Sequence, residues 1–406
     1  ALWKVAQKYK GVKRLALAND AQEEYKVIYK RKHLNLGSER PMNVGERVKI
    51  VLAGGLPDKV PWLIYSNHLP RGNFERRMRD MGLGLDVRCS VYKASMPNVR
   101  VENRTQGAYV YTTYRTPVGE VSTRTRTGLK FQFSGGSWTV EHPVKETGDI
   151  KVLRFMVGDT VYEPDYDNYR QLEEDLEGDG IVTVGSDYTP LMKIIIRYMG
   201  FRTFAVMLRR NPEVIAELIE AIDEKYMEMY RIIADSPAKI VRIGDNIDGV
   251  FVSPSLFEKY CLPHYNKYAD ILKERGKIII SHMDGRLRVL KDLIARTKLD
   301  AIEAFTPPPM GDLPPKEAKE SWGDKIIWMN FPEEIFLRSP EEIRNFTVSL
   351  LENIAPGKGF IISITEDIHP DHFRKGINIV TDTLYKYGSL PIRPPLLKAS
   401  CLKVLS

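Results

Sequence analysis

A repeated alternation of apolar strands and amphipathic helices constrains the fold of this chain more than any other feature. Short apolar runs typical of buried strands alternate with stretches of helical periodicity, mainly beyond residue 150. The expected core strands are residues 60–66, 152–157, 181–186, 239–244, 277–281, 300–304, 325–330 and 359–365. Eight such units, the last followed by a final helix, predict a closed (β/α)₈ TIM barrel rather than an open sheet.

Three further parts are expected around this barrel, which we place at residues 59–390. Residues 1–58 predict a helical arm, in which Asn43 caps a short amphipathic helix that packs over the bottom or side of the barrel. Alternating runs at about 86–150 predict a β-rich insertion of antiparallel hairpins. The insertion is either a lid that covers the barrel mouth or meets a partner, or a plain solvent-facing sheet. Residues 391–406 form a C-terminal tail.

The stretch 277–285 places two potential metal ligands at the end of one expected strand. Three isoleucines precede His282 and Asp284, which are two residues apart and therefore share one face of the strand. An imidazole nitrogen and a carboxylate oxygen on one face are within reach of a single metal ion. The alternative is that His282 caps the next helix and Asp284 makes a turn with Gly285.

Other polar residues also follow the expected strands. In a barrel of this kind the loops after the strands form the active-site face. These loops carry Asn67, His68, Asp187, Tyr188, Asp245, Asn246, Asp248, Glu303, Phe305, Asn330, Phe331, Glu366, Asp367 and His369. Capping a helix or turning a loop is the commoner role for any single one of them, but their concentration predicts a carboxylate-rich active site.

Composition excludes several classes of protein. The net charge is +7, but the charges are mixed along the helices and no dense Lys/Arg run stands out, so nucleic-acid binding is not expected. No apolar run reaches about 18 residues and the start lacks a secretory signal, so we expect a cytoplasmic protein without a membrane span. Cys89, Cys261 and Cys401 are far apart, which argues against disulfides and a structural zinc cluster. A metal would rely on His and carboxylates.

Four motifs in order along the chain carry a resemblance to a known family. They are GDNIDG at 244–249, SPSLFEKYCLPH at 253–264, HMDG at 282–285 and GFIISITE at 359–366. Over roughly residues 150–390 the chain resembles the uroporphyrinogen decarboxylase superfamily, and within it the branch of corrinoid-dependent methyltransferases. Members of that branch that activate thiols carry His-x-Cys-Gly after one strand and a further Cys after the last.

This chain departs from the thiol-activating pattern at two positions. Asp284 and Glu366 stand where the two cysteines are expected. The resemblance therefore implies a divalent ion, with zinc favoured, held by His282, Asp284 and Glu366. Carboxylates leave more positive charge on an ion than thiolates do, which suits activation of an ether oxygen. The expected substrate moves from thiols to O-methyl compounds.

The nearest resemblance is to the methyltransferase I component of anaerobic aromatic O-demethylases. It implies that the methyl group of a methoxylated aromatic passes to the Co(I) centre of a separate corrinoid protein. A corrinoid-binding DxHxxG motif is absent from this chain, so the cofactor belongs to the partner. We assign catalysis to Glu303, which completes the metal shell or protonates the leaving phenolate, and to Asp245. The substrate-binding candidates are Tyr65, Asp187, Tyr188, Phe305, Trp328 and Phe331, although aromatic side chains are more often core than pocket.

Three other functions stay open. A uroporphyrinogen-type decarboxylase is a metal-free lyase, and the arginine-rich stretch Arg-Gln-Ala-Gly-Arg expected of it is missing here. Another metal-dependent barrel enzyme would use the same three ligands. A non-catalytic barrel would bind only a ligand or partner and has no need of aligned metal ligands. The oligomeric state is also open, with a homodimer as one alternative.

Overall fold

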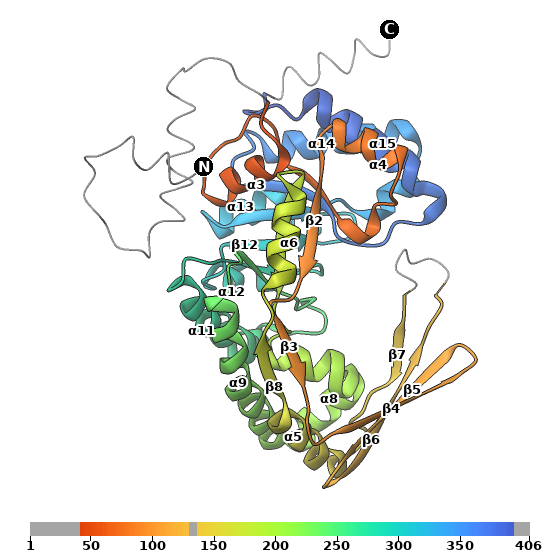
Figure 1. Cartoon of the computed structure of the whole chain (residues 1–406). Helices are drawn as coiled ribbons and strands as arrows, with labels where there is room; N and C mark the ends of the chain where they lie inside the picture. The colour runs from red at the N-terminus through yellow and green to blue at the C-terminus, as the bar shows by residue number, and fades with distance from the viewer. Residues whose placement is uncertain (1–40, 130–135, 394–406) are drawn as a thin grey trace, which may run out of the picture.

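The computed structural model describes residues 41–129 and 136–393. Its centre is a closed barrel of parallel strands in the order β1-β14-β13-β12-β11-β10-β9-β2. Figure 1 labels β2 and β12 of this barrel. The strands are β1 (Trp62–Tyr65), β2 (Leu83–Cys89), β9 (Gly180–Gly185), β10 (Ile240–Ile243), β11 (Ile278–His282), β12 (Ala301–Phe305), β13 (Ile326–Asn330) and β14 (Phe360–Ile364). The predicted (β/α)₈ TIM barrel is confirmed. Residues 1–40 of the predicted arm and 394–406 of the predicted tail lie outside the described residues.

One of the eight expected strands is wrong. Residues 152–157 belong to a helix, α5 (Ile150–Asp159), because its buried Ile150, Leu153 and Val157 recur at helical spacing. The strand that takes its place in the barrel is β2. Asp86 and Arg88 interrupt its apolar character, which hid it from a search for continuous apolar runs.

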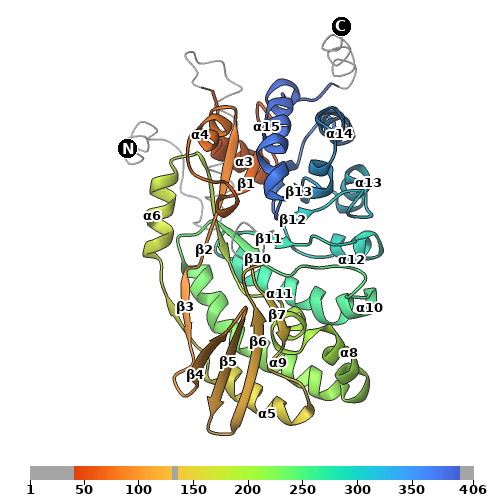
Figure 2. The ribbon, with the colours of Figure 1, turned by 90° about the vertical axis from the view of Figure 1, so that its right-hand side faces the viewer.

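Helices surround the barrel (Figure 2). They are α4 (Asn73–Asp80), α6 (Asp167–Leu176), α7 (Pro190–Lys193), α8 (Gly200–Arg210), α9 (Pro212–Asp235), α10 (Pro254–Leu256), α11 (Leu262–Lys273), α12 (Lys291–Ala295), α13 (Pro315–Trp322), α14 (Pro340–Ile354) and α15 (Pro370–Tyr387). The 3₁₀ turns are η2 (Ser66–His68), η3 (Thr147–Asp149), η6 (Arg288–Leu290) and η7 (Glu333–Leu337), and η4 (Ile194–Met199) and η5 (Phe257–Cys261) are π-helical. Apolar side chains between the strands and these helices form the main core. None of the described helices is long and apolar enough to cross a membrane.

A separate helix, α3 (Val44–Leu52), closes the bottom of the barrel. It begins at Asn43, whose side chain accepts a hydrogen bond from the Glu46 amide (2.8 Å) while the Glu46 carboxylate accepts one from the Asn43 amide (3.0 Å). This reciprocal cap is the start that the sequence predicts. Its apolar face joins one cluster with residues at the beginnings of the barrel strands, among them Ile240 and Ile280. Of the two expected placements, bottom or side, these contacts correspond to the bottom of the barrel.

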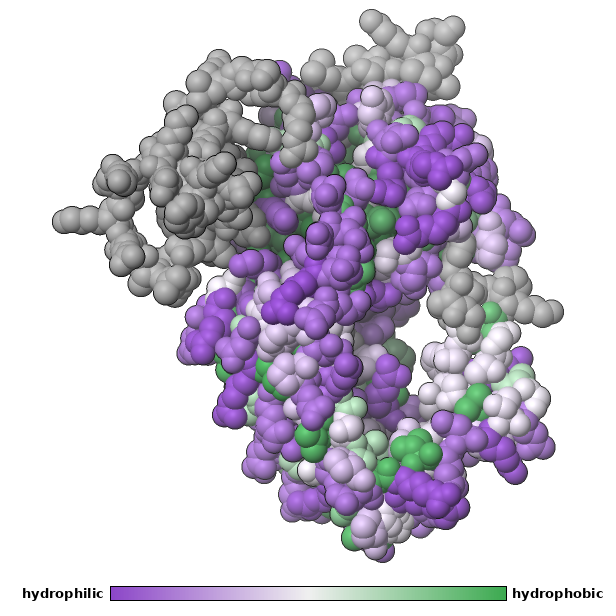
Figure 3. All heavy atoms as spheres, viewed as in Figure 1, coloured by the Kyte–Doolittle hydropathy of each residue, from purple (hydrophilic) through white to green (hydrophobic). Residues whose placement is uncertain are grey.

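Antiparallel strands are present in the region of about 86–150, where the sequence predicts hairpins. A ribbon of β3 (Tyr92–Ser95) and β8 (Val161–Pro164) continues from the end of β2, and β4 (Arg100–Gln106), β5 (Tyr109–Thr116), β6 (Gly119–Arg126) and β7 (Trp138–Glu141) form one sheet. Val99 and Val121 pack this sheet against Val152 and Met156 of α5. The sheet extends away from the barrel with an open space between them (Figure 3). Since β2 runs into this region, the sheet lies on the side where the barrel strands end.

Candidate metal centre at the barrel mouth

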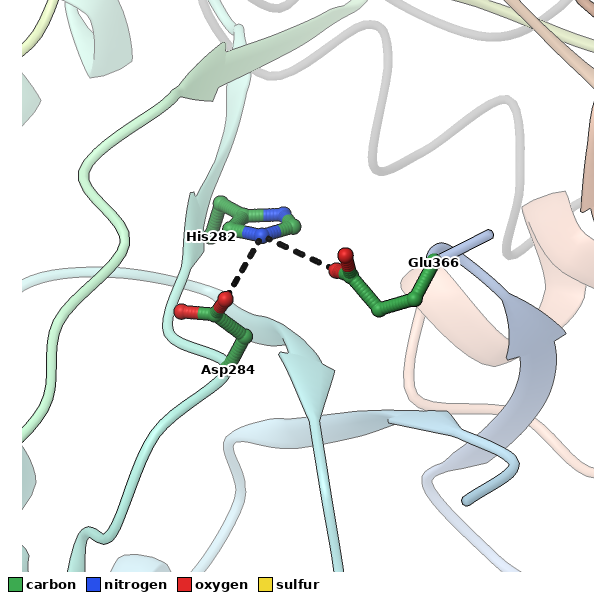
Figure 4. Close-up of side chains that lie close together, drawn as sticks. All are labelled: His282, Asp284 and Glu366. Atoms are coloured by element: carbon green, nitrogen blue, oxygen red, sulfur yellow. Dashed lines mark ion pairs between the residues drawn. The ribbon is translucent and has the colours of Figure 1, made fainter. Parts of the chain in front are cut away.

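The three predicted metal ligands lie together at the carboxyl ends of the barrel strands. His282 is the last residue of β11, Asp284 follows two residues later, and Glu366 follows β14. Nε2 of His282 lies 3.7 Å from Oδ2 of Asp284 and 3.6 Å from Oε1 of Glu366. Figure 4 shows both carboxylates turned toward the same imidazole.

The donor atoms of this cluster suit one divalent cation. One nitrogen and two carboxylate oxygens all lie within 4.8 Å of one another. Zinc–ligand bonds to such atoms are about 2.0–2.2 Å, so donors at these separations can share one ion. Three protein ligands also match the pattern of catalytic zinc sites, in which a further position is left for substrate.

Glu303 fixes the orientation of the His282 ring. The two residues are directly paired across β11 and β12, and Nδ1–H of His282 donates to Oε2 of Glu303 at 2.9 Å. The Tyr65 hydroxyl donates to Oε1 of the same carboxylate at 2.6 Å. Burial alone would raise the pKa of Glu303, but Arg242 and His282 lower it to about 2. Glu303 is therefore a buried carboxylate that leaves Nε2 of His282 to face Asp284 and Glu366.

A buried ion pair extends this network across the barrel interior. Arg242 of β10 lies 3.4 Å from Oε2 of Glu303 through Nε and forms an ion pair with Asp86 of β2. Thr183 donates to the other Asp86 oxygen at 2.8 Å. Asp86 and Arg242 are not among the residues predicted from the sequence. A charged residue inside an otherwise apolar strand, as in Ile240–Ile243, is the signal that could have found them.

The charges of the cluster and the burial of its side chains shift the pKa values of His282 and Glu366. Burial alone would lower the pKa of His282, but the Glu303 and Asp284 carboxylates raise it to about 10. Burial raises the pKa of Glu366 to about 7, with His282 opposing the rise. An ion at Nε2 therefore has to displace a proton, as is usual for His ligands.

A cavity of about 420 Å³ opens beside the metal ligands. It is lined by Asp248, Val250, Phe251, Asp284, Gly285, Arg286, Thr306, Met310, Glu333 and Glu366. Gly285 allows two loops to meet there, since a Cβ at this position would lie 2.3 Å from Cβ of Asp248. The cavity thus has both metal carboxylates, one cation and an aromatic side chain in its walls.

Glu333 is a cavity carboxylate that was not predicted from the sequence. It belongs to η7, the short turn that follows β13. Burial raises its pKa to about 8, the negative charge of Glu366 adds to the rise, and the Asn330 side chain opposes it. The carboxyl group is therefore protonated near neutral pH. Two consecutive glutamates that begin three residues after a strand end are the available sequence signal.

Two of the predicted carboxylates, the catalytic candidate Asp245 and the substrate-binding candidate Asp187, have partners away from this cavity. Asp245 is fully buried and accepts hydrogen bonds from the Thr189 amide and the Tyr265 hydroxyl, each at 2.5 Å. Burial raises its pKa to about 6. Asp187 forms an ion pair with Lys193 at 2.5 Å.

The predicted aromatic residues are spread over the fold. Phe305 packs edge-on against Trp322, with ring centroids 5.5 Å apart, and Phe331 packs in the same layer between strand and helix. Trp328 joins the apolar cluster inside the barrel, and Tyr188 stands beside Arg197. Neither these four side chains nor Tyr65, whose hydroxyl is held by Glu303, lines the 420 Å³ cavity. Phe251 provides its aromatic wall.

Comparison with known proteins gives consistent matches over most of the barrel. The family model described as uroporphyrinogen decarboxylase (URO-D) matches residues 127–387. Uroporphyrinogen decarboxylase of Hydrogenovibrio crunogenus is 24% identical over 277 residues, which cover 64% of this chain and 75% of that protein. The enzyme of the same name from Geotalea uraniireducens is 25% identical over 253 residues, covering 60% and 70%.

A solved structure shares the fold over a longer stretch. A methyltransferase from Methanosarcina mazei aligns with a TM-score of 0.52 and 13% identity, over 85% of this chain and 99% of that one. At this identity the likeness concerns the fold alone.

Proposed function

Since this chain belongs to the uroporphyrinogen decarboxylase family, we propose that it has adapted the family's barrel to methyl transfer. In this proposal it removes the methyl group from methoxylated aromatic compounds and passes it to the Co(I) centre of a separate corrinoid protein. The observation that carries the proposal is the cluster of His282, Asp284 and Glu366 beside a cavity. The shared fold of a solved methyltransferase supports it.

The ligand set argues for an oxygen substrate. When bound, a divalent ion, with zinc favoured, would polarise the ether oxygen of the methoxyl group. Asp284 and Glu366 hold that ion with hard oxygen donors, which quench its charge less than thiolates would. The protein's contribution is to keep both carboxylates and Nε2 of His282 pointing to one place.

Glu303 acts on this site through His282. Its carboxylate accepts hydrogen bonds from Tyr65 and His282 and pairs with Arg242. Its pKa of about 2 keeps it ionised. These contacts favour a positioning role over the alternative in which Glu303 protonates the leaving group. Partners of this kind fix the tautomer of a metal-bound His.

Glu333 is our candidate for the proton donor. In the reaction the methyl–oxygen bond breaks, the methyl carbon takes the electron pair of Co(I), and the phenolate oxygen that leaves requires a proton. Glu333 lines the cavity with Asp284 and Glu366, and its raised pKa keeps it protonated near neutral pH. A carboxylic acid with this environment can deliver the proton to the departing oxygen.

The substrate pocket and the partner surface follow from the same cavity. Its volume of about 420 Å³ suits a single-ring compound, Phe251 offers a face for the ring, and Arg286 is available to a ring carboxylate. The β sheet stands on the side where the barrel strands end, with open space before it (Figure 3). That space supports the expectation that the corrinoid protein meets the insertion.

A direct assay tests the proposal. The purified chain, loaded with zinc, is incubated with a series of methoxybenzoates and a corrinoid protein reduced to Co(I), and methyl-cobalt formation is followed by its visible spectrum. Methyl transfer should require both the methoxyl group and the ion. Transfer that persists at the full rate after removal of metal by a chelator would contradict the assigned role of the cluster.

A second candidate function is decarboxylation. The relatives in Hydrogenovibrio crunogenus and Geotalea uraniireducens are both uroporphyrinogen decarboxylases. If this chain shares their activity, uroporphyrinogen should lose carbon dioxide without added metal. The same preparation should then be inactive toward every methoxybenzoate.

A further inference from the structure

A second cavity lies apart from the metal centre. It has a volume of about 250 Å³ and is lined by the β3–β8 ribbon, α5, α9 and the segment from β9 to η4. The walls carry the rings of Tyr92, Tyr162, Tyr198 and Tyr226. It shares no lining residue with the cavity beside His282, so it is a separate candidate site.

The tyrosine hydroxyls make this cavity unusual. Tyr226 is only 3% exposed, and its hydroxyl oxygen is buried without a hydrogen-bond partner in the described part of the chain. Burial raises the pKa of each of the four tyrosines, and nearby acidic or phenolic groups add to this rise in all four. The hydroxyls therefore remain O–H groups that can donate to an acceptor. A buried hydroxyl without an acceptor lowers stability, so its presence calls for a ligand that supplies one.

The polar groups in the walls favour a ligand that accepts hydrogen bonds. Lys193 is paired with Asp187, and Lys225 is paired with Glu228 at 2.9 Å. An ammonium group has three N–H donors, and the hydrogen bonds of each lysine among the described residues use one of them. A ligand carboxylate, which only accepts, can be held by the remaining donors together with the Tyr226 hydroxyl.

We propose that this cavity binds a small aromatic carboxylate. The carboxylate accepts hydrogen bonds from the Tyr226 hydroxyl and from the lysines, and the ring packs among the tyrosine rings. Tyr92 and Tyr162 already meet edge to face, with centroids 5.6 Å apart, and such aromatic surfaces accept another ring. The volume is below the range of drug-sized pockets, which restricts the ligand to a single ring.

Benzoate is a suitable probe, and binding to the full chain is measured by calorimetry. Tyr226→Phe keeps the ring and removes the hydroxyl, so it should weaken benzoate binding about tenfold, as expected for a hydrogen bond to a charged group. Its melting temperature should be unchanged or higher, because no protein partner is lost. Tyr166→Phe, whose hydroxyl donates to the Ile232 carbonyl outside the cavity, is the matched control and should bind benzoate as the wild type does.

Two further arms keep this site distinct from the metal centre. Benzyl alcohol, which lacks the charge, should bind at least tenfold more weakly than benzoate. His282→Ala should leave benzoate binding unchanged. The proposal is overturned if benzoate shows no saturable binding, if Tyr226→Phe binds it as tightly as the wild type, or if binding disappears in His282→Ala. Arg286→Ala, which removes the cation of the 420 Å³ cavity, should also leave benzoate binding to the tyrosine-lined cavity unchanged, and this separates the two sites.

Discussion

Nδ1 of His282 lies 2.9 Å from Oε2 of Glu303, and this contact decides which imidazole nitrogen faces the metal-binding carboxylates. The pair is built into the barrel, because the two residues are register partners on adjacent strands. Glu303 is itself held by Tyr65 and Arg242, so the ring orientation rests on side chains from several strands. The metal centre is therefore positioned from below by the charged interior of the barrel.

We expect Glu303→Gln to weaken metal binding. The variant keeps the size of the side chain but removes the charge that holds the Nδ1 proton, and changes of this type typically cost about 10–100-fold in affinity. The zinc dissociation constant is measured by competition with a coloured chelator. Glu317→Gln, at a half-buried glutamate that pairs with Arg288 outside the metal cluster, is the control and should match the wild type. Equal affinities in all three proteins would show that the contact has no positioning role.

Arg242→Leu should strongly destabilise the fold. The arginine is 5% exposed and is the cation between Asp86 and Glu303, so its removal leaves these two buried carboxylates without the cation they share. Breaking a buried pair in this way costs about 3–5 kcal/mol. The free energy of unfolding is measured in urea and compared with Arg296→Leu, which removes an exposed pair with Glu258 and should cost about 0–1 kcal/mol. A similar decrease in the free energy of unfolding in both variants would contradict the stabilising role of the buried ion pairs.

The rate of methyl transfer should fall at alkaline pH, which gives its pH profile an alkaline limb, because Glu333 loses its proton there. Its pKa is raised from 4.5 to about 8, so the carboxyl holds its proton below that pH and loses it as the pH rises. The rate should fall on the alkaline side, beginning at or below pH 8 because a bound cation favours the carboxylate. Glu333→Gln should be slower by about 10²–10⁴-fold, the usual contribution of a general acid, and should lose this limb.

The control for this prediction is the neighbouring residue. Glu334→Gln changes an exposed glutamate that pairs with Arg338, and its rate and pH profile should equal those of the wild type. An unchanged rate and alkaline limb in Glu333→Gln would assign the proton to another group.

The parts of the fold that follow simple periodicity could be predicted from the sequence. Seven barrel strands and the cap at Asn43 could be predicted because each is a local sequence pattern. The strand β2 could not be predicted, because Asp86 is typical of a loop unless its pairing with Arg242 across the barrel is known. Such a pair depends on contacts far apart in the sequence, which periodicity does not report.

The same distinction applies to the site. His282 and Asp284 share one strand face by spacing, whereas Glu366 entered through the family resemblance. The cavity walls could not be predicted, since whether Phe331 or Phe251 faces the cavity depends on how loops fold over the mouth. Glu333 was overlooked for the same reason, because its burial arises from tertiary packing.

The hardness of the ligands offers a separate test of the substrate assignment. Asp284→Cys combined with Glu366→Cys should retain zinc, because thiolates are good zinc ligands. It should lose demethylation of methoxybenzoates, because thiolates donate more charge and weaken the ion as a Lewis acid. Demethylation is measured on the zinc-loaded variant. A wild-type rate there would show that carboxylate ligands are irrelevant to the choice of substrate.

Metal content tests the central claim most directly. Elemental analysis of the purified chain after incubation with zinc and removal of excess should find about one ion per wild-type molecule. The double variant His282→Ala with Glu366→Ala should hold close to none, while His372→Ala with Glu334→Ala, outside the cluster, should hold as much as the wild type. Equal metal content in the wild type and in the His282→Ala, Glu366→Ala variant would contradict the metal centre and the function built on it.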